Sequence, residues 1–266
     1  NGTGNGLFSP NASVTYEQAV KMILDVLGYR EYISKRYGAD FTGYVTMASR
    51  LKLSSGVGIK SNSEELTADK AIKLLYNAGC SYVMEESGFT GDGEITYEIN
   101  EGKMLLSVNN NIYYGEGLVK SDGMAALSPY NVSEGIAVID GKEYVLEDTD
   151  ISSMLGCRVK YFYNDNSGSY TNLLWAAPTQ FNSIITVKAS DLQTNDARYS
   201  FTNIVYEENG RTKEIKLDSL ADIVWNYTVS NGKKITPKSG YATFIDNNND
   251  KKYDTVIIEE FDNLFV

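Results

Sequence analysis

VTYEQAVKMILDVL at residues 14–27 and LTADKAIKLLYNAG at residues 66–79 are two copies of one pattern, offset by 52 residues. Within each copy the apolar side chains recur at positions i, i+3, i+4 and i+7, which places them on one face of a helix. A repeat of this length predicts stacked helical units whose apolar faces need neighbours. The residues on the two faces are Ala19, Met22, Ile23 and Val26, then Ala71, Leu74, Leu75 and Ala78.

Local signals set the expected ends of these helices. Thr15 and Thr67 stand where an N-cap belongs, and Gln18 completes a capping box in the first copy. Gly28 and Gly79 stand where the helices are expected to end. A third helix is expected between the copies, after Gly43, and its apolar face consists of Tyr44, Met47, Ala48 and Leu51.

These residues resemble the S-layer homology (SLH) domain, in the form found in surface proteins of clostridia and their relatives. The resemblance covers residues 7–80, as the last half of one motif and a complete second motif. It implies motifs that pack in a pseudo-threefold arrangement, with grooves that hold anionic, often pyruvylated, cell-wall polysaccharide. The stretches that carry the resemblance are Phe8–Ala19, Leu27–Tyr29, Gly43–Ala48 and Leu66–Ala78.

The chain departs from the family pattern at the position that follows the motif's Thr. The family has an Arg there, whose guanidinium could pair with a glycan carboxylate, whereas this chain has Tyr16 and Ala68. Two interpretations therefore stay open for both copies, a structural role and residual contact with glycan. The candidate glycan-binding residues are Thr15, Tyr16, Glu17, Lys35, Arg36, Arg50, Thr67 and Asp69.

From Gly88 onward, short strand-like runs alternate with turn signals. Asp140-Gly141 joins two such runs, and the Asn/Ser/Gly-rich run at residues 164–168 joins two more, as in β-hairpins. Pro178 interrupts the pattern before a second set of strands. We expect an α+β, multidomain fold, with an N-terminal α-helical SLH-like repeat module followed by small antiparallel all-β barrels or sandwiches. The expected domains are residues 1–84, 85–180 and 181–266.

Charge and composition restrict the function. The chain has 24 Lys and Arg against 35 Asp and Glu, and it has no His, so His-based catalysis and His-ligated metals are excluded. A net charge of −11 argues against nucleic acid as a partner, and the apolar runs are too short to span a membrane. Residues 1–84 carry a net charge of +2 and residues 85–266 a net charge of −13, which suggests parts with different partners.

One stretch, Asp246–Asp254, has the spacing of a calcium-binding loop. Its oxygen donors fall at positions 1, 3, 5 and 9, with a backbone carbonyl at position 7. Against calcium, position 6 is Lys251 in place of Gly, and position 12 is Ile257 in place of a bidentate Glu. The sequence thus leaves a polar turn without a cofactor and a calcium site both open. The candidate ligands are Asp246, Asn248, Asp250, Lys252 and Asp254.

Together these features favour a non-catalytic segment of a secreted protein on the cell wall or cell surface of a Gram-positive bacterium. Its expected partners are cell-wall polysaccharide or neighbouring surface-layer subunits. The alternative is a carbohydrate-binding or accessory region of an extracellular polysaccharide-degrading enzyme. Trp175, Trp225 and the 20 tyrosines could offer stacking surfaces for sugars, although in strands such rings also serve as core or cross-strand partners.

Overall fold

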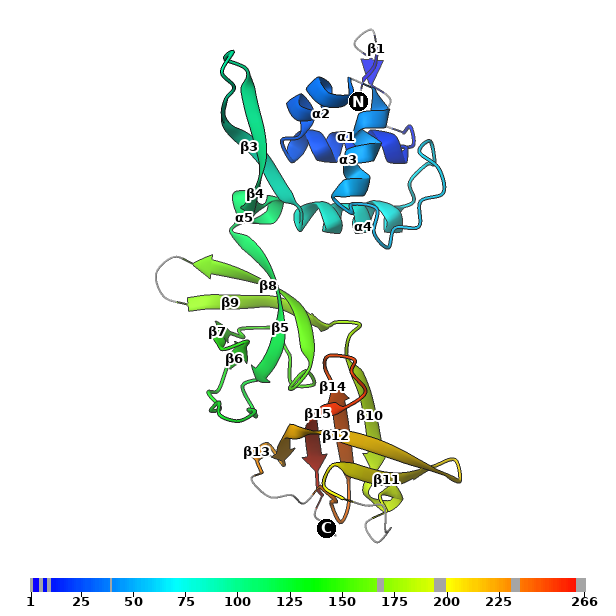
Figure 1. Cartoon of the computed structure of the whole chain (residues 1–266), viewed down its shortest axis with the longest axis vertical. Coiled ribbons are helices and arrows are strands. Elements are labelled where there is room, and N and C mark those ends of the chain that lie inside the picture. Colours follow the sequence, from blue (N-terminus) through cyan, green and yellow to red (C-terminus); the bar gives the residue numbers. More distant parts are fainter. Residues whose placement is uncertain are drawn as a thin grey trace. The chain divides into compact units, whose positions relative to one another are not determined.

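The computed structural model divides the chain into two compact units, Asn1–Ile112 and Tyr113–Val266 (Figure 1). The structure describes residues 2–4, 7–8, 11–38, 40–166, 170–193, 200–230 and 235–261. The predicted turn at residues 164–168 is described only as far as residue 166. Within the described residues, no helix has both the length and the apolar character needed to cross a membrane.

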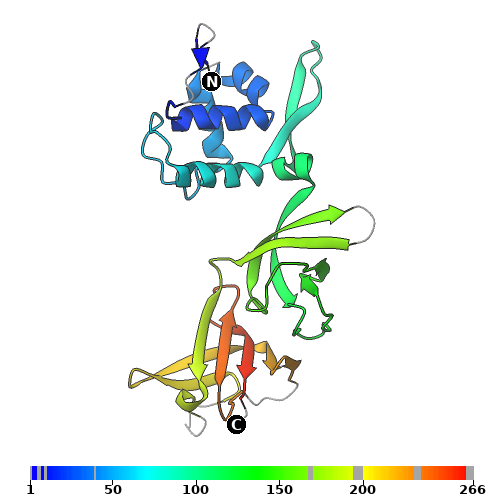
Figure 2. The ribbon, with the colours of Figure 1, turned by 180° about the vertical axis from the view of Figure 1, so that it is seen from behind.

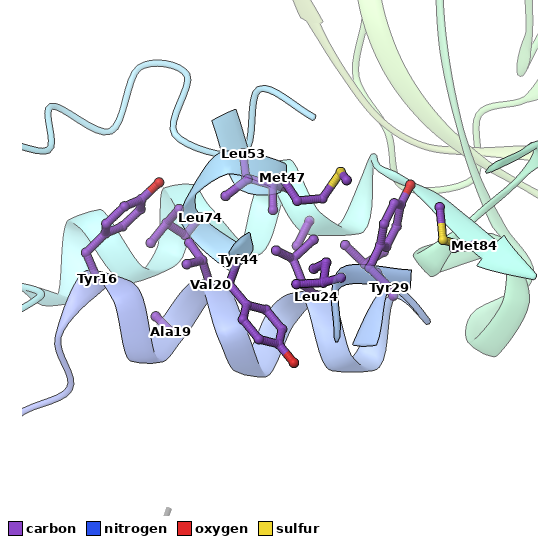
Figure 3. Close-up of a cluster of buried hydrophobic side chains, with 14 of the residues drawn as sticks. Tyr16, Ala19, Val20, Leu24, Tyr29, Tyr44, Met47, Leu53, Leu74 and Met84 are labelled. Atoms are coloured by element: carbon purple, nitrogen blue, oxygen red, sulfur yellow. The ribbon is translucent and has the colours of Figure 1, made fainter. Parts of the chain in front are cut away.

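The first unit begins with a short strand pair and four helices. Strands β1 (Gly2–Gly4) and β2 (Leu7–Phe8) pair antiparallel. The helices are α1 (Tyr16–Val26), α2 (Arg30–Tyr37), α3 (Phe41–Arg50) and α4 (Ala68–Gly79). The apolar faces of α1, α3 and α4 meet in one core, and Figure 3 shows its side chains pointing toward one another between these helices.

The glycines of this unit act in different ways. Gly28 follows the end of α1 at φ 87°, a left-handed conformation that ends a helix. Gly79 is the last residue of α4, as the sequence predicted, whereas Gly43 lies inside α3 and does not precede that helix. A Cβ on Gly43 would lie 2.7 Å from the Cβ of Tyr37, and one on Gly79 would lie 3.0 Å from a methyl group of Leu106. Both positions are glycine because another element packs directly against the helix.

A β-hairpin completes the first unit. Strands β3 (Tyr82–Phe89) and β4 (Ile95–Met104) pair antiparallel, and helix α5 (Leu105–Asn110) follows them. Val83 and Met84 of β3 are buried in the same core as the helices, and Figure 3 places Met84 beside Tyr29. The backbone N–H of Met84 donates to the carbonyl of Leu27 (2.9 Å), so the hairpin is bonded to the end of α1.

The predicted fold class is wrong. The described residues are mainly β, with 43% in strands and 21% in helices, and among them no N-terminal module is built from helical repeats alone. Helices α1, α3 and α4 form close to where the periodicity places them, but their core is closed by a strand. The predicted boundary after Met84 therefore falls inside β3, where it would cut through one hydrophobic core. Periodicity reports the face that each helix buries, and it does not report what covers that face.

The second unit begins with a closed five-stranded barrel. Its strands are β5 (Ile112–Ser121), β6 (Ile136–Ile139), β7 (Lys142–Val145), β8 (Arg158–Asn166) and β9 (Tyr170–Pro178), in the order β5-β6-β7-β9-β8. The pairs β6–β7 and β8–β9 are the two hairpins that the turn signals predict. Closure of the barrel needs β7 to pair with β9 in parallel. No local sequence signal predicts this pairing.

A six-stranded sheet follows the barrel in the same unit. Strands β10 (Ser183–Lys188), β14 (Tyr241–Asp246), β15 (Tyr253–Glu259), β12 (Arg211–Trp225) and β11 (Asn203–Glu208) lie in that order, and β13 (Thr228–Val229) pairs with β12. In Figure 2, β10, β14 and β15 are the yellow-green, orange and red arrows that lie side by side. Between β10 and β11 lies a 3₁₀ turn at Ala189–Asp191.

The barrel and the sheet share buried contacts. Leu155 from the barrel segment and Val224 from the sheet belong to one hydrophobic cluster, and Ile245 of the sheet packs in the barrel core. Gly156, at φ 76°, lies against Thr255, where an added Cβ would come within 2.7 Å of the Thr side chain. The predicted domain boundary near residue 180 thus separates barrel strands from sheet strands, but both belong to one compact unit.

We expect Gly28→Ala to destabilise the chain by about 3 kcal/mol, because it imposes a left-handed conformation on Ala and a clash with β3. The new Cβ would lie 2.4 Å from the carbonyl oxygen of Met84. Gly56→Ala is the matched control, since Gly56 is also left-handed at φ 71° but has no atom within 4 Å of the added Cβ. The control substitution should lower the free energy of unfolding, measured in urea, by about 1 kcal/mol. Equal losses for the two variants would contradict the role of the hairpin in the core.

Candidate functional site

The eight candidate glycan residues fall into two sets with different contacts. Five of them lie at the N-terminal ends of α1 and α4, and three lie on α2 and α3. In the first set, residues 15–17 contact the chain segment at residues 62–65, and Thr67 bonds to Asp69, whereas the basic set contacts Tyr37 and the β3–β4 hairpin. The structure therefore does not join the eight residues into one site.

In the first set, the residues before and within the first turn of α1 hold a neighbouring loop. Thr15 is the N-cap, and its backbone N–H donates to the side chain of Gln18 (3.1 Å), which is half of the predicted capping box. The N–H groups of Tyr16 and Glu17 donate to the carbonyls of Glu64 (2.8 Å) and Asn62 (3.0 Å). Tyr16 is 4% exposed and its hydroxyl bonds to Ser54, so its ring is part of the core.

The second part of this set caps α4. Thr67 is the N-cap, and its hydroxyl donates to the carboxylate of Asp69. This hydrogen bond is the main cause of a lowered pKa of Asp69. Nearby, the ammonium group of Lys70 pairs with Glu64, and this contact is the main cause of the lowered pKa of Glu64. These side chains therefore cap the start of α4 and fix a loop, which agrees with the structural one of the two interpretations.

The basic set surrounds tyrosine rings. The Cζ atoms of Arg36 and Arg50 lie 5.9 and 5.7 Å from the centroid of the Tyr37 ring, within the range of a cation–π contact. The Nζ of Lys35 donates to the carbonyl of Ile95 (3.3 Å) and lies 5.7 Å from the centroid of the Tyr97 ring. Within the described residues neither guanidinium has a carboxylate within 4.0 Å, whereas Lys35 has Glu94 at 3.9 Å.

A groove of about 280 Å³ lies between these helices and the hairpin. Arg50 and Met47 of α3 line one side, Tyr32 of α2 contributes a ring, and Tyr97 and Glu98 come from β4. Arg50 is exposed, and the two tyrosines are half-buried. A guanidinium that shares a groove with two tyrosine rings can bind an acidic group while the rings contact a flat apolar surface.

Sequence reasoning found Arg50 but missed the two tyrosines of the groove. Tyr97 lies 47 residues after Arg50, in a segment that the sequence assigned to another domain. Tyr32 lies in α2, a helix with no apolar stripe that periodicity could detect. No local signal connects these residues, because the hairpin brings them together only in the folded unit.

The loop at residues 246–254 joins β14 to β15 and is a hydrogen-bonded turn. The carboxylate of Asp246 accepts the N–H groups of Asn248 (3.1 Å), Asn249 (2.7 Å) and Lys251 (2.9 Å). The side chains of Asn248 and Asp250 each accept the N–H two residues further on. Asn249 and Lys251 have positive φ, which such turns need.

Carboxylates of this loop repel one another, which disfavours the ionised form of Asp254. Burial is the main cause of a raised pKa of Asp254, and the carboxylates of Asp246, Asp250 and Asp218 raise it further. A cation would relieve that repulsion. Within the described residues, however, no three Asp, Glu or Cys side chains converge as metal ligands, so a calcium ion would depend on the amide of Asn248 and the carbonyl of Lys252 as well. Calcium binding remains a prediction.

Comparison with known proteins finds a relative on the bacterial surface. The chain is 24% identical over 263 residues to a protein named "Cell surface protein" from Thermoanaerobacter kivui. The match covers 93% of this chain but 29% of that protein, so the chain spans under a third of the length of the relative. No family model and no solved structure matches the chain.

We expect millimolar calcium to raise the melting temperature above that in EDTA, because an ion bound only by the folded loop stabilises the fold. Asp250→Asn removes one exposed carboxylate from the loop and should reduce the rise. Thermal unfolding followed by calorimetry measures both effects. Equal melting temperatures in the two buffers would leave the loop as a turn without a metal.

Proposed function

We propose that this chain is a non-catalytic segment of a secreted Gram-positive cell-surface protein, which attaches to or assembles on the cell wall. The observation that carries the proposal is the groove of the first unit, which Arg50 lines together with Tyr32 and Tyr97. Its partner would be an anionic cell-wall polysaccharide, with neighbouring surface-layer subunits as the second class of partner. The similarity to a cell surface protein over 93% of the chain supports the location.

The chemistry of the groove suits an acidic sugar polymer. A guanidinium can donate two parallel hydrogen bonds to a carboxylate, and a tyrosine ring offers an apolar face beside a hydroxyl. Arg36 adds a second positive charge on the same Tyr37 ring that Arg50 contacts. The resemblance of residues 7–80 to the SLH domain supports the same partner, although the Arg here comes from α3 and not from the family's signature position.

The absence of catalysis is part of the proposal. The chain contains no His, so a general base of ordinary pKa near neutrality is lacking. The carboxyl groups with raised pKa, Asp122, Asp222 and Asp254, owe the shift mainly to burial and serve turns or strand contacts. We expect any catalytic centre of the whole protein to lie outside this segment.

A second candidate function is a carbohydrate-binding accessory region of a polysaccharide-degrading enzyme. Exposed aromatic rings on the second unit favour it. Trp175 of β9 is 41% exposed, its ring centroid is 5.9 Å from that of Phe162, and the Nζ of Lys160 lies 5.9 Å from the Trp centroid. Such rings are a surface on which a sugar can stack.

Arg50→Gln should weaken retention of the full chain on purified anionic cell-wall polymer about tenfold, because it removes the charge-assisted hydrogen bonds. Co-sedimentation with the polymer at low and physiological salt measures the effect. Arg36→Gln should weaken retention less, since that side chain does not line the groove.

Lys73→Gln is the matched control for this experiment. It removes one positive charge from an exposed position on α4 of the same unit and should leave retention unchanged. Equal losses for Arg50→Gln and Lys73→Gln would indicate only a general dependence on net charge. Full retention by Arg50→Gln would contradict the proposed site.

A further inference from the structure

The turn between β12 and β13 holds a tyrosine in an unusual backbone conformation. Trp225 pairs with Thr228, so Asn226 and Tyr227 form a two-residue hairpin loop. Their φ values are 43° and 67°, and a loop with two left-handed residues has a strong preference for Asn-Gly. Tyr occupies the position where Gly would be free of strain, and strained residues of this kind cluster at ligand-binding sites.

The side chain of Asn226 fixes this turn to the end of β15. Its amide nitrogen donates to the carbonyl of Glu260 (3.1 Å), and its amide oxygen accepts the N–H of the same residue (2.8 Å). The Asn226 amide thereby bonds both backbone polar groups of one residue, Glu260. Tyr227 is 57% exposed, so its side chain contributes little to the hydrophobic core. Core packing therefore does not explain why a strained position carries a tyrosine.

Tyr227 lines a groove of about 330 Å³ in the second unit, between the barrel loops and the sheet. Buried apolar residues, among them Ala125, Leu155 and Val224, line part of it. Polar residues line much of the rest, namely Ser152, Ser153, Asn226, Asp122 and Glu259. An apolar surface with a few polar groups and an exposed ring is the composition of a small-molecule site.

The polar groups indicate the class of ligand. Asp122 is 5% exposed and fixed by the N–H groups of Met124 (2.8 Å) and Ala125 (2.7 Å), which donate to its Oδ1. Both charged side chains that line the groove are acidic, and the second unit has 14 basic against 22 acidic residues. An anionic ligand would be repelled, whereas sugar hydroxyls can donate to carboxylates and exchange hydrogen bonds with serine.

We propose that this groove binds an uncharged oligosaccharide, with one sugar ring stacked on Tyr227 and its hydroxyls bonded to Asp122, Glu259 and the two serines. The site deepens the second candidate function and is independent of the anionic-polymer groove in the first unit. It also gives the strain at Tyr227 a reason, because the ring has to project from a tight turn to reach the ligand.

Isothermal titration of the full chain with the hexamers of β-1,4-linked glucose and of β-1,4-linked N-acetylglucosamine tests the proposal, with a galacturonate hexamer as the anionic comparison. At least one neutral hexamer should bind, and the galacturonate hexamer should bind more weakly. Tyr227→Gly should weaken neutral binding about tenfold through loss of the stacked ring. The same change should raise the melting temperature, because Gly suits the left-handed position.

Two further variants complete the test. Tyr227→Phe keeps the ring and should keep most of the affinity, while Leu220→Ala, at an 87% exposed residue outside the groove, should change nothing. Arg50→Gln should leave hexamer binding intact and Tyr227→Gly should leave polymer retention intact, so either proposal can fail alone. The inference is overturned if neither neutral hexamer binds, if galacturonate binds as well as they do, or if Tyr227→Gly binds like the unchanged chain.

Discussion

The hydrogen bond from the N–H of Met84 to the carbonyl of Leu27, beside Gly28, is the contact on which the first unit depends. Helices α1, α3 and α4 have apolar faces, but α4 ends at Gly79 and the core extends to Val83 and Met84 of β3. The strand can approach this closely because Gly28 has no Cβ. Once β3 is fixed, β4 follows by antiparallel pairing, and Tyr97 reaches the helices that carry Lys35 and Arg50. The candidate wall-binding groove is therefore a consequence of one backbone contact.

Sequence reasoning succeeded where the determining forces are local. The helices at Tyr16–Val26 and Ala68–Gly79 follow from apolar spacing and caps, and the β6–β7 hairpin follows from Asp140-Gly141. It failed where two segments distant in the chain close a core. The parallel contact of β7 with β9 and the entry of β3 among the helices have no signature of their own, because burial on one face does not specify the covering partner. The sequence predicted a module of helices alone, but the apolar faces of these helices are also covered by β3.

The same limit applies to the site and to the charge. Thr15, Thr67 and Asp69 were placed correctly at helix starts, but their bonds are structural. Of the two tyrosines that line the groove with Arg50, Tyr97 comes from outside the expected first domain. The division into a basic and an acidic part also weakens in the folded units. Asn1–Ile112 carries 10 basic and 13 acidic side chains, because the hairpin adds six acidic residues to the helices. Glu94 pairs with Lys35, so part of the positive charge is compensated within the unit.

In the second unit, as in the first, two elements approach closely at a glycine that leaves no room for a Cβ. Gly156 lies against Thr255, and the side chain of Asn247 donates to the carbonyl of Gly156 (3.2 Å), so the barrel is bonded to the sheet beside the acidic loop. This contact fixes the barrel loops that carry Asp122 and Ser152 relative to the turn that carries Tyr227. Each groove thus combines side chains from segments that are distant in the sequence, in a unit where two elements are bonded at or beside a glycine. In the second unit, loops and a turn carry Asp122, Ser152 and Tyr227 and a packed core carries the geometry, so substitutions in that groove can change binding with little effect on folding.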